Sequence, residues 1–185
     1  MNKKTLGIIG FGRIGRRVYE IAYPLKMKTI IFDPFFSATK SIKNNIEVTQ
    51  SLNELLINSD IITIHCPLNK HTKYMIGENE LKKMKKNSYL INTARGSIID
   101  ETALVKALNK GWIAGAAIDT FEKEPLDFSS KLIKLENLYM TPHIAAIARE
   151  SYVKTGCLAV NLLLKVINNR INEIDEKYFI IKYTK

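Results

Sequence analysis

The sequence predicts an α/β fold in which a doubly wound parallel sheet carries helices on both faces. Short apolar runs alternate along the chain with segments of helical periodicity, and polar residues follow most of these runs. Continuous apolar runs are typical of strands buried in a parallel sheet, and their alternation with helices implies right-handed crossovers. At 185 residues, 46% of them hydrophobic, the chain can form one well-packed domain, with room for an appended element.

The expected elements follow in order along the chain. The first strand, 6–9, leads through a glycine-rich turn into a helix over 16–23. Further strands are expected over 29–32, 47–49, 61–64, 89–92, 114–118 and 138–140. Helices are expected from 52 with Ser51 as N-cap, over 78–85, over 101–109 with Asp100 as N-cap, and from 144 to about 168. The tail over 170–185 is ambiguous, since 178–181 fits either a strand or a packing segment.

A glycine motif, Gly10-Phe11-Gly12-Arg13-Ile14-Gly15, lies between the first predicted strand and helix. Gly10 permits a tight turn, Gly12 lets the backbone approach a pyrophosphate, and Gly15 lets the helix pack closely on the strand. The N–H groups and the positive dipole end of the helix then face the phosphates. Glycine turns are common, but the strand–turn–helix order favours a Rossmann-type site for a dinucleotide.

Asp33 ends the second predicted strand, where an acidic side chain can accept hydrogen bonds from a ribose 2′-hydroxyl. A carboxylate there repels the 2′-phosphate of NADP, and no Arg or Lys follows at once in Pro34-Phe35-Phe36. We therefore expect NAD as the cofactor. The alternative is an ordinary glycine turn with Asp33 as a capping or turn residue before Pro34.

The formal charge of +10 comes mostly from lysines spread along the chain. The Lys82–Lys86 cluster lies beside a short predicted helix and fits a solvated face. No basic stripe is interleaved with aromatic residues, so we expect no nucleic-acid partner. The positive field could still attract anionic cofactors and carboxylate substrates.

The two cysteines, Cys66 and Cys157, show neither a C-x-x-C motif nor metal-ligand spacing. Two free thiols in a reducing cytosol are the simple interpretation, so we expect a cytoplasmic protein without a metal site. The start of the chain faintly resembles a signal peptide, but its apolar stretch runs straight into the glycine turn. No apolar run is long enough to span a bilayer, and we expect no membrane association.

Three further residues could support hydride transfer to a 2-oxo acid, which needs a cation, an acid and a partner for that acid. Arg95 follows the strand over 89–92 and offers a bidentate fork for a carboxylate. His143 follows the strand over 138–140 and can exchange a proton near neutral pH. Glu124 can hold the imidazolium. Spacing alone also allows other roles. Arg95 could form a surface salt bridge, His143 could cap a helix, and Glu124 could be a solvated carboxylate.

Several motifs in order resemble the NAD-binding domain of the D-isomer-specific 2-hydroxyacid dehydrogenases. This family includes D-3-phosphoglycerate, glycerate/hydroxypyruvate, formate and D-lactate dehydrogenases. The resemblance runs from Leu6 to about Ala146 and includes Gly10–Gly15, Phe32-Asp33-Pro34, His65-Cys66-Pro67-Leu68 with Thr72, Asn92-Thr93-Ala94-Arg95-Gly96, Asp100-Glu101, Ala103-Leu104, Ala117-Ile118-Asp119-Thr120-Phe121, Glu124-Pro125-Leu126 and Thr141-Pro142-His143-Ile144-Ala145-Ala146. The residues of these motifs are most similar to those of the phosphoglycerate- and hydroxypyruvate-type members.

The resemblance implies a role for each matching residue. Arg95 would bind the substrate, and His143 would be the acid/base with Glu124 as its partner. Arg13 and Ile14 would meet the pyrophosphate and Asp33 the adenosine ribose. The nicotinamide end would be bordered by Thr93, Ala94, Asp119, Ala145 and Ala146, with Asp119 on the carboxamide, and the adenosine side by Cys66, Pro67 and Thr72.

The resemblance also implies an NAD-binding Rossmann domain over 1–168, a tail over 169–185 and a largely absent family substrate-binding domain. The first hypothesis is that the chain is an oxidoreductase domain acting on a small 2-oxo or 2-hydroxy acid. Under this hypothesis the domain is incomplete as a lone chain. A homodimer or a separate chain would then supply the missing wall of the cleft. The helix over 103–108 and the segment from Trp112 would offer apolar surface to a dimer. The alternatives are a non-catalytic NAD(H)-binding module and a truncated relict.

Overall fold

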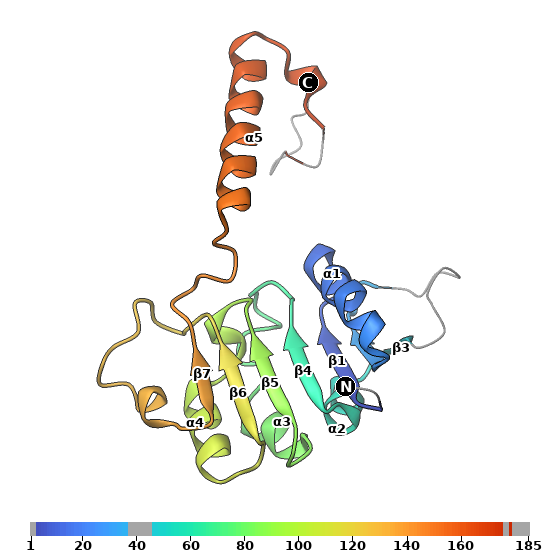
Figure 1. Ribbon diagram of the computed structural model, residues 1–185, viewed down its shortest axis with the longest axis vertical. Coiled ribbons are helices and arrows are strands. Elements are labelled where there is room, and N and C mark those ends of the chain that lie inside the picture. Colours follow the sequence, from blue (N-terminus) through green and yellow to red (C-terminus); the bar gives the residue numbers. More distant parts are fainter. Residues whose placement is uncertain (1–2, 37–45, 176–177, 179–185) are drawn as a thin grey trace. The chain divides into compact units, whose positions relative to one another are not determined.

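The computed structural model of the chain describes residues 3–36, 46–175 and 178. The chain divides into two compact units, Met1–Ala145 and Ala146–Lys185. The first unit holds a seven-stranded sheet in the order β3-β2-β1-β4-β5-β6-β7, in which every neighbouring pair is parallel (Figure 1). This order is the doubly wound Rossmann order with one strand added at the β6 edge. The predicted fold class is confirmed.

The strands are β1 Thr5–Ile9, β2 Lys28–Phe32, β3 Ile46–Thr49, β4 Ile61–Ile64, β5 Tyr89–Asn92, β6 Gly115–Ile118 and β7 Leu138–Met140. The helices of the first unit are α1 Arg13–Ala22, α2 Leu52–Asn58, α3 Glu78–Lys83 and α4 Glu101–Asn109. Short 3-10 turns cover Tyr23–Leu25, Gly96–Ile98 and Lys131–Lys134. The second unit holds α5 Arg149–Ile167 and a 3-10 turn over Ile171–Glu173.

Helices lie on both faces of the sheet, with a separate apolar core under each. In Figure 1, α1 lies in front of the sheet and α2, α3 and α4 lie behind it. The core under α1 contains Leu6, Ile8, Tyr19, Ala22, Met27 and Ile31. The larger core contains Leu55, Leu56, Leu81, Leu90, Leu104 and Leu108. Burying one such side chain stabilises the fold by about 1.5–3 kcal/mol. The two cores together therefore hold the strands, and with them the strand ends that carry the candidate site, in place.

The direction of strand order reverses at β1, which pairs with β2 on one side and β4 on the other. Ile9 at the end of β1 is in register with Phe32 of β2 and with Ile64 of β4. In open α/β sheets, ligands bind beyond the carboxyl ends of the strands at such a reversal. The glycine motif and Asp33 both follow strands at this point.

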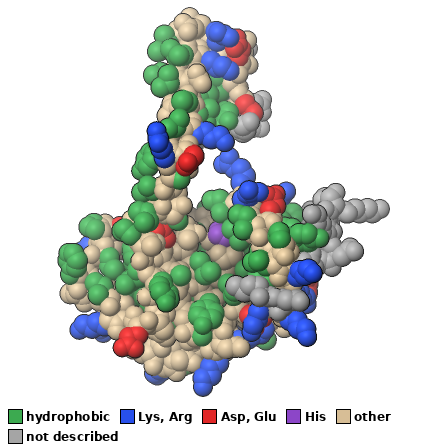
Figure 2. Space-filling model, in the orientation of Figure 1, with side chains coloured by type: hydrophobic (Ala, Val, Ile, Leu, Met, Phe, Trp, Pro, Cys, Tyr) green, Lys and Arg blue, Asp and Glu red, His purple; other side chains and the backbone are tan. Residues whose placement is uncertain are grey.

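The face of the sheet that carries α1 is open over β5 to β7 within the first unit. Tyr89 of β5 and Tyr139 of β7 are 52% and 79% exposed there, and Figure 2 shows hydrophobic side chains gathered over this region. Because parallel sheets are usually covered on both faces, this patch is an exposed apolar surface on the described part of the first unit.

Several sequence expectations differ from the structure. The helix expected from 144 begins at Arg149, because the chain before it is held in a loop by Asp119, as described below. The apolar residues of α4 face the chain's own core: Ala103, Leu104, Ala107 and Leu108 are all buried, so α4 does not offer them to a dimer partner. The segment over 178–181, which fits either a strand or a packing segment, lies outside the described residues except for Tyr178.

The second unit begins at Ala146, before the end of the domain expected over 1–168. The expected boundary at 168 therefore stays a prediction. Among the described residues, no helix combines the length and the apolar character needed to cross a bilayer.

Candidate active site

The glycine motif forms the tight turn between β1 and α1, and two of its glycines are sterically required. Gly10 has a φ of +89°, and a Cβ on it would lie 2.7 Å from the backbone nitrogen of Cys66. A Cβ on Gly15 would overlap the carbonyl oxygen of Gly10. No larger residue fits either position without moving backbone, so the turn, β4 and α1 are held in close contact.

Gly12 is different, because a Cβ there would meet nothing within 4 Å. It is the N-cap residue of α1, and no side chain caps the helix at this point. The first-turn residues Arg13 and Ile14 are exposed, with Ile14 at 65%. The first N–H groups of a helix have no partner within the helix. The space over Gly12 therefore fits an anionic group bound at the start of α1.

Asp33 supports the glycine turn through its carboxylate. Its Oδ2 accepts a hydrogen bond from the N–H of Phe11 at 2.7 Å, and its Oδ1 accepts one from the N–H of Phe35 at 2.9 Å. The N–H of Gly10 in turn donates to the carbonyl of Phe32 at 2.9 Å. Asp33 thus makes the contacts expected of a residue that stabilises the turn. It also lies at the strand end where a ribose is expected.

Arg16 was not singled out by the sequence, yet it packs against the same turn. Its guanidinium lies 5.6 Å from the ring centroid of Phe11 and 5.3 Å from that of Phe36. Its Nε also donates to the carbonyl of Phe11 at 3.1 Å. Because Phe11 is buried against α1, Arg16 stabilises the turn by cation–π contact.

The segment after β4 lies beside Gly10. The N–H of His65 donates to the carbonyl of Ile9 at 2.7 Å, which places Cys66 next to the turn. Burial raises the pKa of the Cys66 thiol to about 11 and lowers the pKa of the His65 imidazole. Farther along, the Thr72 hydroxyl donates to the carbonyl of Pro67 at 2.7 Å. Burial thus disfavours the thiolate form of Cys66, whose backbone lies beside Gly10.

The turn after β5 presents Arg95 and is organised by Asn92, a buried residue that the sequence patterns did not assign to the site. The Asn92 Oδ1 accepts from the N–H of Ala94 at 3.0 Å, and its Nδ2 donates to the carbonyl of Arg95 at 2.9 Å. Thr93 is exposed in this turn. The Arg95 guanidinium is exposed and donates to the carbonyl of Ala94 at 2.6 Å, so it is available to an anion.

His143 and Glu124 form the predicted pair. The Nδ1 of His143 lies 2.8 Å from Oε2 of Glu124, while Oε1 of Glu124 accepts from the N–H of Phe121 at 3.0 Å. The hydrogen bond to His143 is the main cause that lowers the pKa of Glu124, and the N–H of Phe121 and the charge of Arg95 lower it further. Glu124 is therefore a carboxylate at neutral pH.

The loop that carries His143 is anchored by Asp119, which is buried at the end of β6 with 3% exposure. Its carboxylate accepts from the N–H groups of Ile144 and Ala145, both at 2.8 Å, and from the Thr141 hydroxyl. His143 itself has a φ of +55°, a backbone conformation that costs a non-glycine residue about 1–3 kcal/mol. The Asp119 contacts offset this strain.

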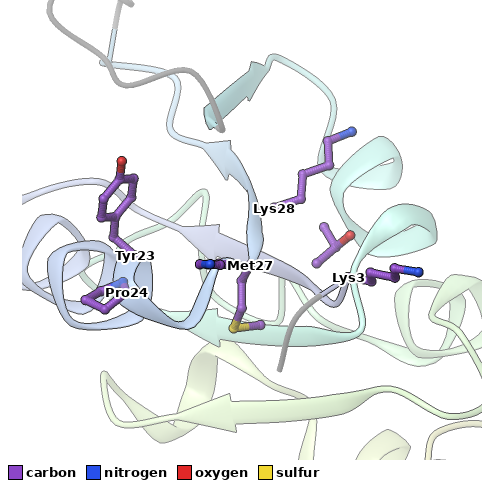
Figure 3. Close-up of a pocket in the computed structure, with 7 residues that line it drawn as sticks. Lys3, Tyr23, Pro24, Met27 and Lys28 are labelled. Carbon is purple, nitrogen blue, oxygen red and sulfur yellow. The ribbon is translucent and has the colours of Figure 1, made fainter.

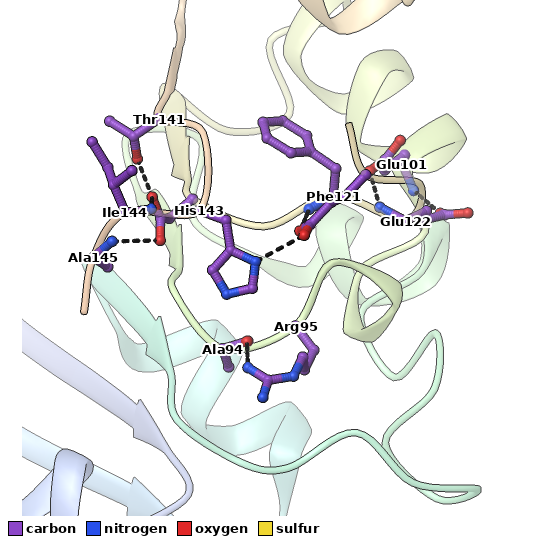
Figure 4. Close-up of polar contacts among 11 residues, drawn as sticks. Ala94, Arg95, Glu101, Phe121, Glu122, Thr141, His143, Ile144 and Ala145 are labelled. Carbon is purple, nitrogen blue, oxygen red and sulfur yellow. Dashed lines mark hydrogen bonds and ion pairs between the residues drawn. The ribbon is translucent and has the colours of Figure 1, made fainter. Parts of the chain in front are cut away.

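The structure brings Arg95, Glu124 and His143 to one edge of the sheet, beyond the carboxyl ends of β5, β6 and β7. Figure 4 shows the His143 imidazole between Phe121 and the turn that bears Ala94 and Arg95. The charges of both Arg95 and His143 act on Glu124, which places the three groups in one electrostatic field. Ala145 belongs to this edge, whereas Ala146 begins the second unit.

A hollow elsewhere in the unit does not belong to this site. It has a volume of about 580 Å³ and is lined by Lys3, Thr5, Tyr23, Pro24, Lys26, Met27 and Lys28 (Figure 3). Thr5 and Lys28 begin β1 and β2, so this hollow lies at the amino ends of the strands, opposite the candidate site. Among the residues described, no group of three or more His, Cys, Asp or Glu side chains could hold a metal ion.

Comparisons with known proteins agree with this arrangement. The family model described as D-isomer specific 2-hydroxyacid dehydrogenase, NAD binding domain, matches residues 1–145. A glyoxylate reductase of Aeropyrum pernix is 43% identical over 173 residues, which cover 91% of this chain and 50% of that protein. A D-3-phosphoglycerate dehydrogenase of Archaeoglobus fulgidus is 40% identical over 84% of this chain and 29% of its own length.

Solved structures resemble the chain in the same way. The NAD-complexed D-isomer specific 2-hydroxyacid dehydrogenase of Lactobacillus delbrueckii ssp. bulgaricus superposes with a TM-score of 0.80 at 34% identity. The match covers 89% of this chain and 53% of that one. The chain thus spans about half the length of the glyoxylate reductases that it matches. The family match covers residues 1–145, which carry both the glycine turn and the edge with Arg95, Glu124 and His143. The chain therefore belongs to the D-isomer specific 2-hydroxyacid dehydrogenase family and contains its NAD-binding domain.

Proposed function

We propose that this chain supplies the NAD(H) site and the acid/base pair of a dehydrogenase that interconverts a small 2-oxo acid and a D-2-hydroxy acid. The observation that carries the proposal is the 2.8 Å contact between His143 Nδ1 and Glu124 Oε2, at the edge that also presents Arg95. A module that only binds NAD(H) has no need of an imidazole held by a carboxylate beside an exposed guanidinium.

The glycine turn fits the diphosphate of the cofactor. The open space over Gly12 and the uncapped start of α1 would receive the phosphates, with Arg13 and Ile14 beside them, and Asp33 would accept from the adenosine ribose. By the family resemblance, Cys66, Pro67 and Thr72 would border the adenosine side and Thr93, Ala94, Asp119, Ala145 and Ala146 the nicotinamide end. When bound, NAD(H) supplies or accepts the hydride.

The chain's own residues would handle the charges and the proton. Arg95 would bind the substrate carboxylate with its two parallel N–H groups and polarise the adjacent carbonyl. Because Nδ1 of His143 is turned toward Glu124, Nε2 is left to give a proton to the carbonyl oxygen during reduction and to take it back during oxidation. Glu124 stays ionised and stabilises the protonated imidazole.

The substrate that we propose is glyoxylate or a close 2-oxo acid such as hydroxypyruvate, pyruvate or phosphohydroxypyruvate. Four relatives named glyoxylate reductase, at 41–46% identity, support a small acid. A site made only from the residues described here leaves Arg95 and His143 exposed to water, which weakens their electrostatic effect. We therefore propose that a separate chain or a homodimer covers this edge during turnover.

The cellular setting belongs to the same proposal. Both Cys66 and Cys157 are free thiols, which supports a reducing compartment such as the cytoplasm. Fractionation of the source cells with the chain tagged at its C-terminus tests this directly. Recovery of the tagged chain in the cytoplasmic fraction is expected, and recovery only in an oxidising compartment would contradict it.

The proposed activity is tested by following NADH consumption with each of the four 2-oxo acids in turn. His143→Ala is expected to abolish consumption while NADH binding, followed by fluorescence, is unchanged. His71→Ala is the matched control, because His71 is an exposed histidine to which no catalytic role is assigned. Equal rates for the wild type and His143→Ala would overturn the assignment of His143 as the acid.

A further inference from the structure

The turn after Arg95 and the loop before Glu124 are in direct backbone contact at Gly96. A Cβ on Gly96 would overlap the carbonyl carbon of Phe121 and would lie 2.5 Å from the nitrogen of Glu122. Gly96 follows Arg95 in the chain, and Phe121 and Glu122 come just before Glu124. This contact therefore sets the separation between the segments that carry Arg95 and Glu124.

Beside this contact, Glu101 and Glu122 exchange hydrogen bonds through each other's backbone. The N–H of Glu101 donates to Oε1 of Glu122 at 2.9 Å, and the N–H of Glu122 donates to Oε1 of Glu101 at 2.6 Å. Glu101 is the first residue of α4, which packs in the larger core. The pair thus attaches the loop that carries Glu124 to a rigid helix.

Tyr74 adds a third connection. Its hydroxyl donates to Oε2 of Glu122 at 3.2 Å, and its N–H donates to the carbonyl of Ser97 at 2.8 Å. Both oxygens of Glu122 are therefore in use, one toward α4 and one toward the segment packed on the Gly96 turn. Burial and the charge of Glu122 raise the pKa of Glu101, so the two carboxylates are held together against their mutual repulsion.

We propose that Glu122 and Glu101 are positioning residues for the acid/base pair. Their reciprocal contacts, together with the Gly96 contact, hold the 121–124 loop so that Glu124 meets His143 and Arg95 at a fixed separation. Neither carboxylate touches the imidazole or the guanidinium in the contacts described, so each acts through the loop. This inference rests on the proposed function, since the arrangement matters for catalysis only if the three residues act on a substrate.

The role proposed for Glu101 and Glu122 depends on their hydrogen bonds and not only on their negative charge. It therefore differs from that of a general acidic surface. The hydrogen bonds to Glu101 and Glu122 come from backbone N–H groups, which an amide oxygen can accept as well as a carboxylate. Glu122→Gln therefore keeps the oxygen that receives the N–H of Glu101, whereas Glu122→Ala removes it. The two substitutions separate a positioning contact from a charge effect.

The test is a two-dimensional NMR spectrum of the histidine rings in the full 185-residue chain, which contains only three histidines. Glu122→Ala is expected to shift the ring resonances of His143 while leaving those of His65 and His71 unchanged. Glu122→Gln is expected to restore the wild-type position. Lys123→Ala, at an exposed side chain in the same loop, is the matched control and is expected to cause no shift.

Glu101→Ala tests the same contact from the helix side. It is expected to shift His143 in the same direction. Because each single variant removes a different one of the two reciprocal hydrogen bonds, the double variant Glu101→Ala/Glu122→Ala is expected to shift His143 at least as far as either single variant. Thermal unfolding of each variant shows whether it is folded. A folded Glu122→Ala chain with unchanged His143 resonances, or equal shifts in Glu122→Gln and Glu122→Ala, would overturn the proposal. Since the spectrum needs neither cofactor nor turnover, failure of the proposed function would leave this result intact.

Discussion

Glu124 Oε2 lies 2.8 Å from Nδ1 of His143, a residue whose backbone has the unusual φ of +55°. The two residues come from different loops, one after β6 and one after β7, and each loop has its own anchor. Phe121 N–H fixes the other oxygen of Glu124, and Asp119 fixes the loop of His143. The orientation of the imidazole is thus set by contacts on both sides before any substrate is present.

Removing the carboxylate of Glu124 is expected to reduce turnover strongly. In Glu124→Ala the imidazole loses the partner of its Nδ1, so we expect kcat to fall by roughly a hundredfold or more, the size typical of general acid/base groups. Steady-state rates of NADH consumption measure this. The exposed Glu136→Gln is the control, and an unchanged kcat in Glu124→Ala would contradict the role of the pair.

Gly15 and Gly12 of the turn are expected to respond differently to alanine. Gly15→Ala should destabilise the fold by about 1–3 kcal/mol, the usual cost of overpacking, because its Cβ would overlap the Gly10 carbonyl. Gly12→Ala should leave stability nearly unchanged, since its Cβ meets nothing, but should weaken NADH binding by filling the space for the diphosphate. Urea unfolding and NADH fluorescence measure the two effects, and full NADH affinity in Gly12→Ala would contradict the assignment.

Asp119 is expected to make the stability of the fold depend on pH in the acid range. Burial opposes its charge, but the hydrogen bonds from Thr141, Ala145 and Ile144 outweigh it, so the pKa of Asp119 is lowered in the folded chain. Its stabilisation is therefore fully present above the unfolded value of about 3.9 and is lost as the pH falls through the folded value.

Asp119→Asn tests this dependence. At pH near 7 the variant should lose about 2 kcal/mol of unfolding free energy, since one of several hydrogen bonds to a buried carboxylate is broken. The difference from the wild type should shrink as the pH falls below the folded pKa. Urea unfolding at a series of pH values measures it. A difference that grows in acid would show that the sign is wrong.

Thr120 is a buried residue whose hydroxyl has no hydrogen-bond partner among the described residues. Thr120→Val keeps the shape and removes the unpaired group, so we expect a gain of about 1 kcal/mol in unfolding free energy. Thr63→Val is the matched comparison, because the Thr63 hydroxyl lies 2.9 Å from Nε2 of His65, and this variant should lose stability. Equal effects of the two substitutions would contradict the burial argument.

The two cysteines are expected to react at very different rates. With the pKa of Cys66 near 11, about a thousandth of this thiol is ionised at pH 8, whereas Cys157 is exposed. Alkylation followed by peptide mass analysis should label Cys157 first. Comparable labelling of both thiols in the folded chain would contradict the described burial of Cys66.

Local patterns in the sequence were enough to predict the sheet and the glycine turn. Gly10 and Gly15 are needed by a single strand–turn–helix unit, so their spacing alone indicates their place. Apolar runs likewise gave most strands to within a residue or two, because strands buried in a parallel sheet are largely apolar. Asp33 could be placed at the end of its strand for the same reason.

Contacts between distant segments were not predictable from the sequence. Gly96 has no local signal that distinguishes it from an ordinary turn glycine, since it meets the Phe121–Glu122 peptide only when β5 and β6 pair. Asn92 binds its own turn at Ala94 and Arg95, but its residue type alone does not separate it from other turn residues. The helix expected from Ile144 starts at Arg149 because Asp119 binds the N–H groups of Ile144 and Ala145. That interaction depends on the pairing of β6 with β7.

The central claim is that NAD(H) binds across the turn between β1 and α1 with its reactive end toward His143. Titration of the labelled 185-residue chain with NADH, followed by amide NMR, tests it most directly. If the claim is right, the Gly12, Arg13, Asp33 and Ala145 amides shift together and saturably with NADH. Saturating NADH that leaves these amides in place, or moves only those around Lys3 and Lys28 at the opposite edge, would contradict it.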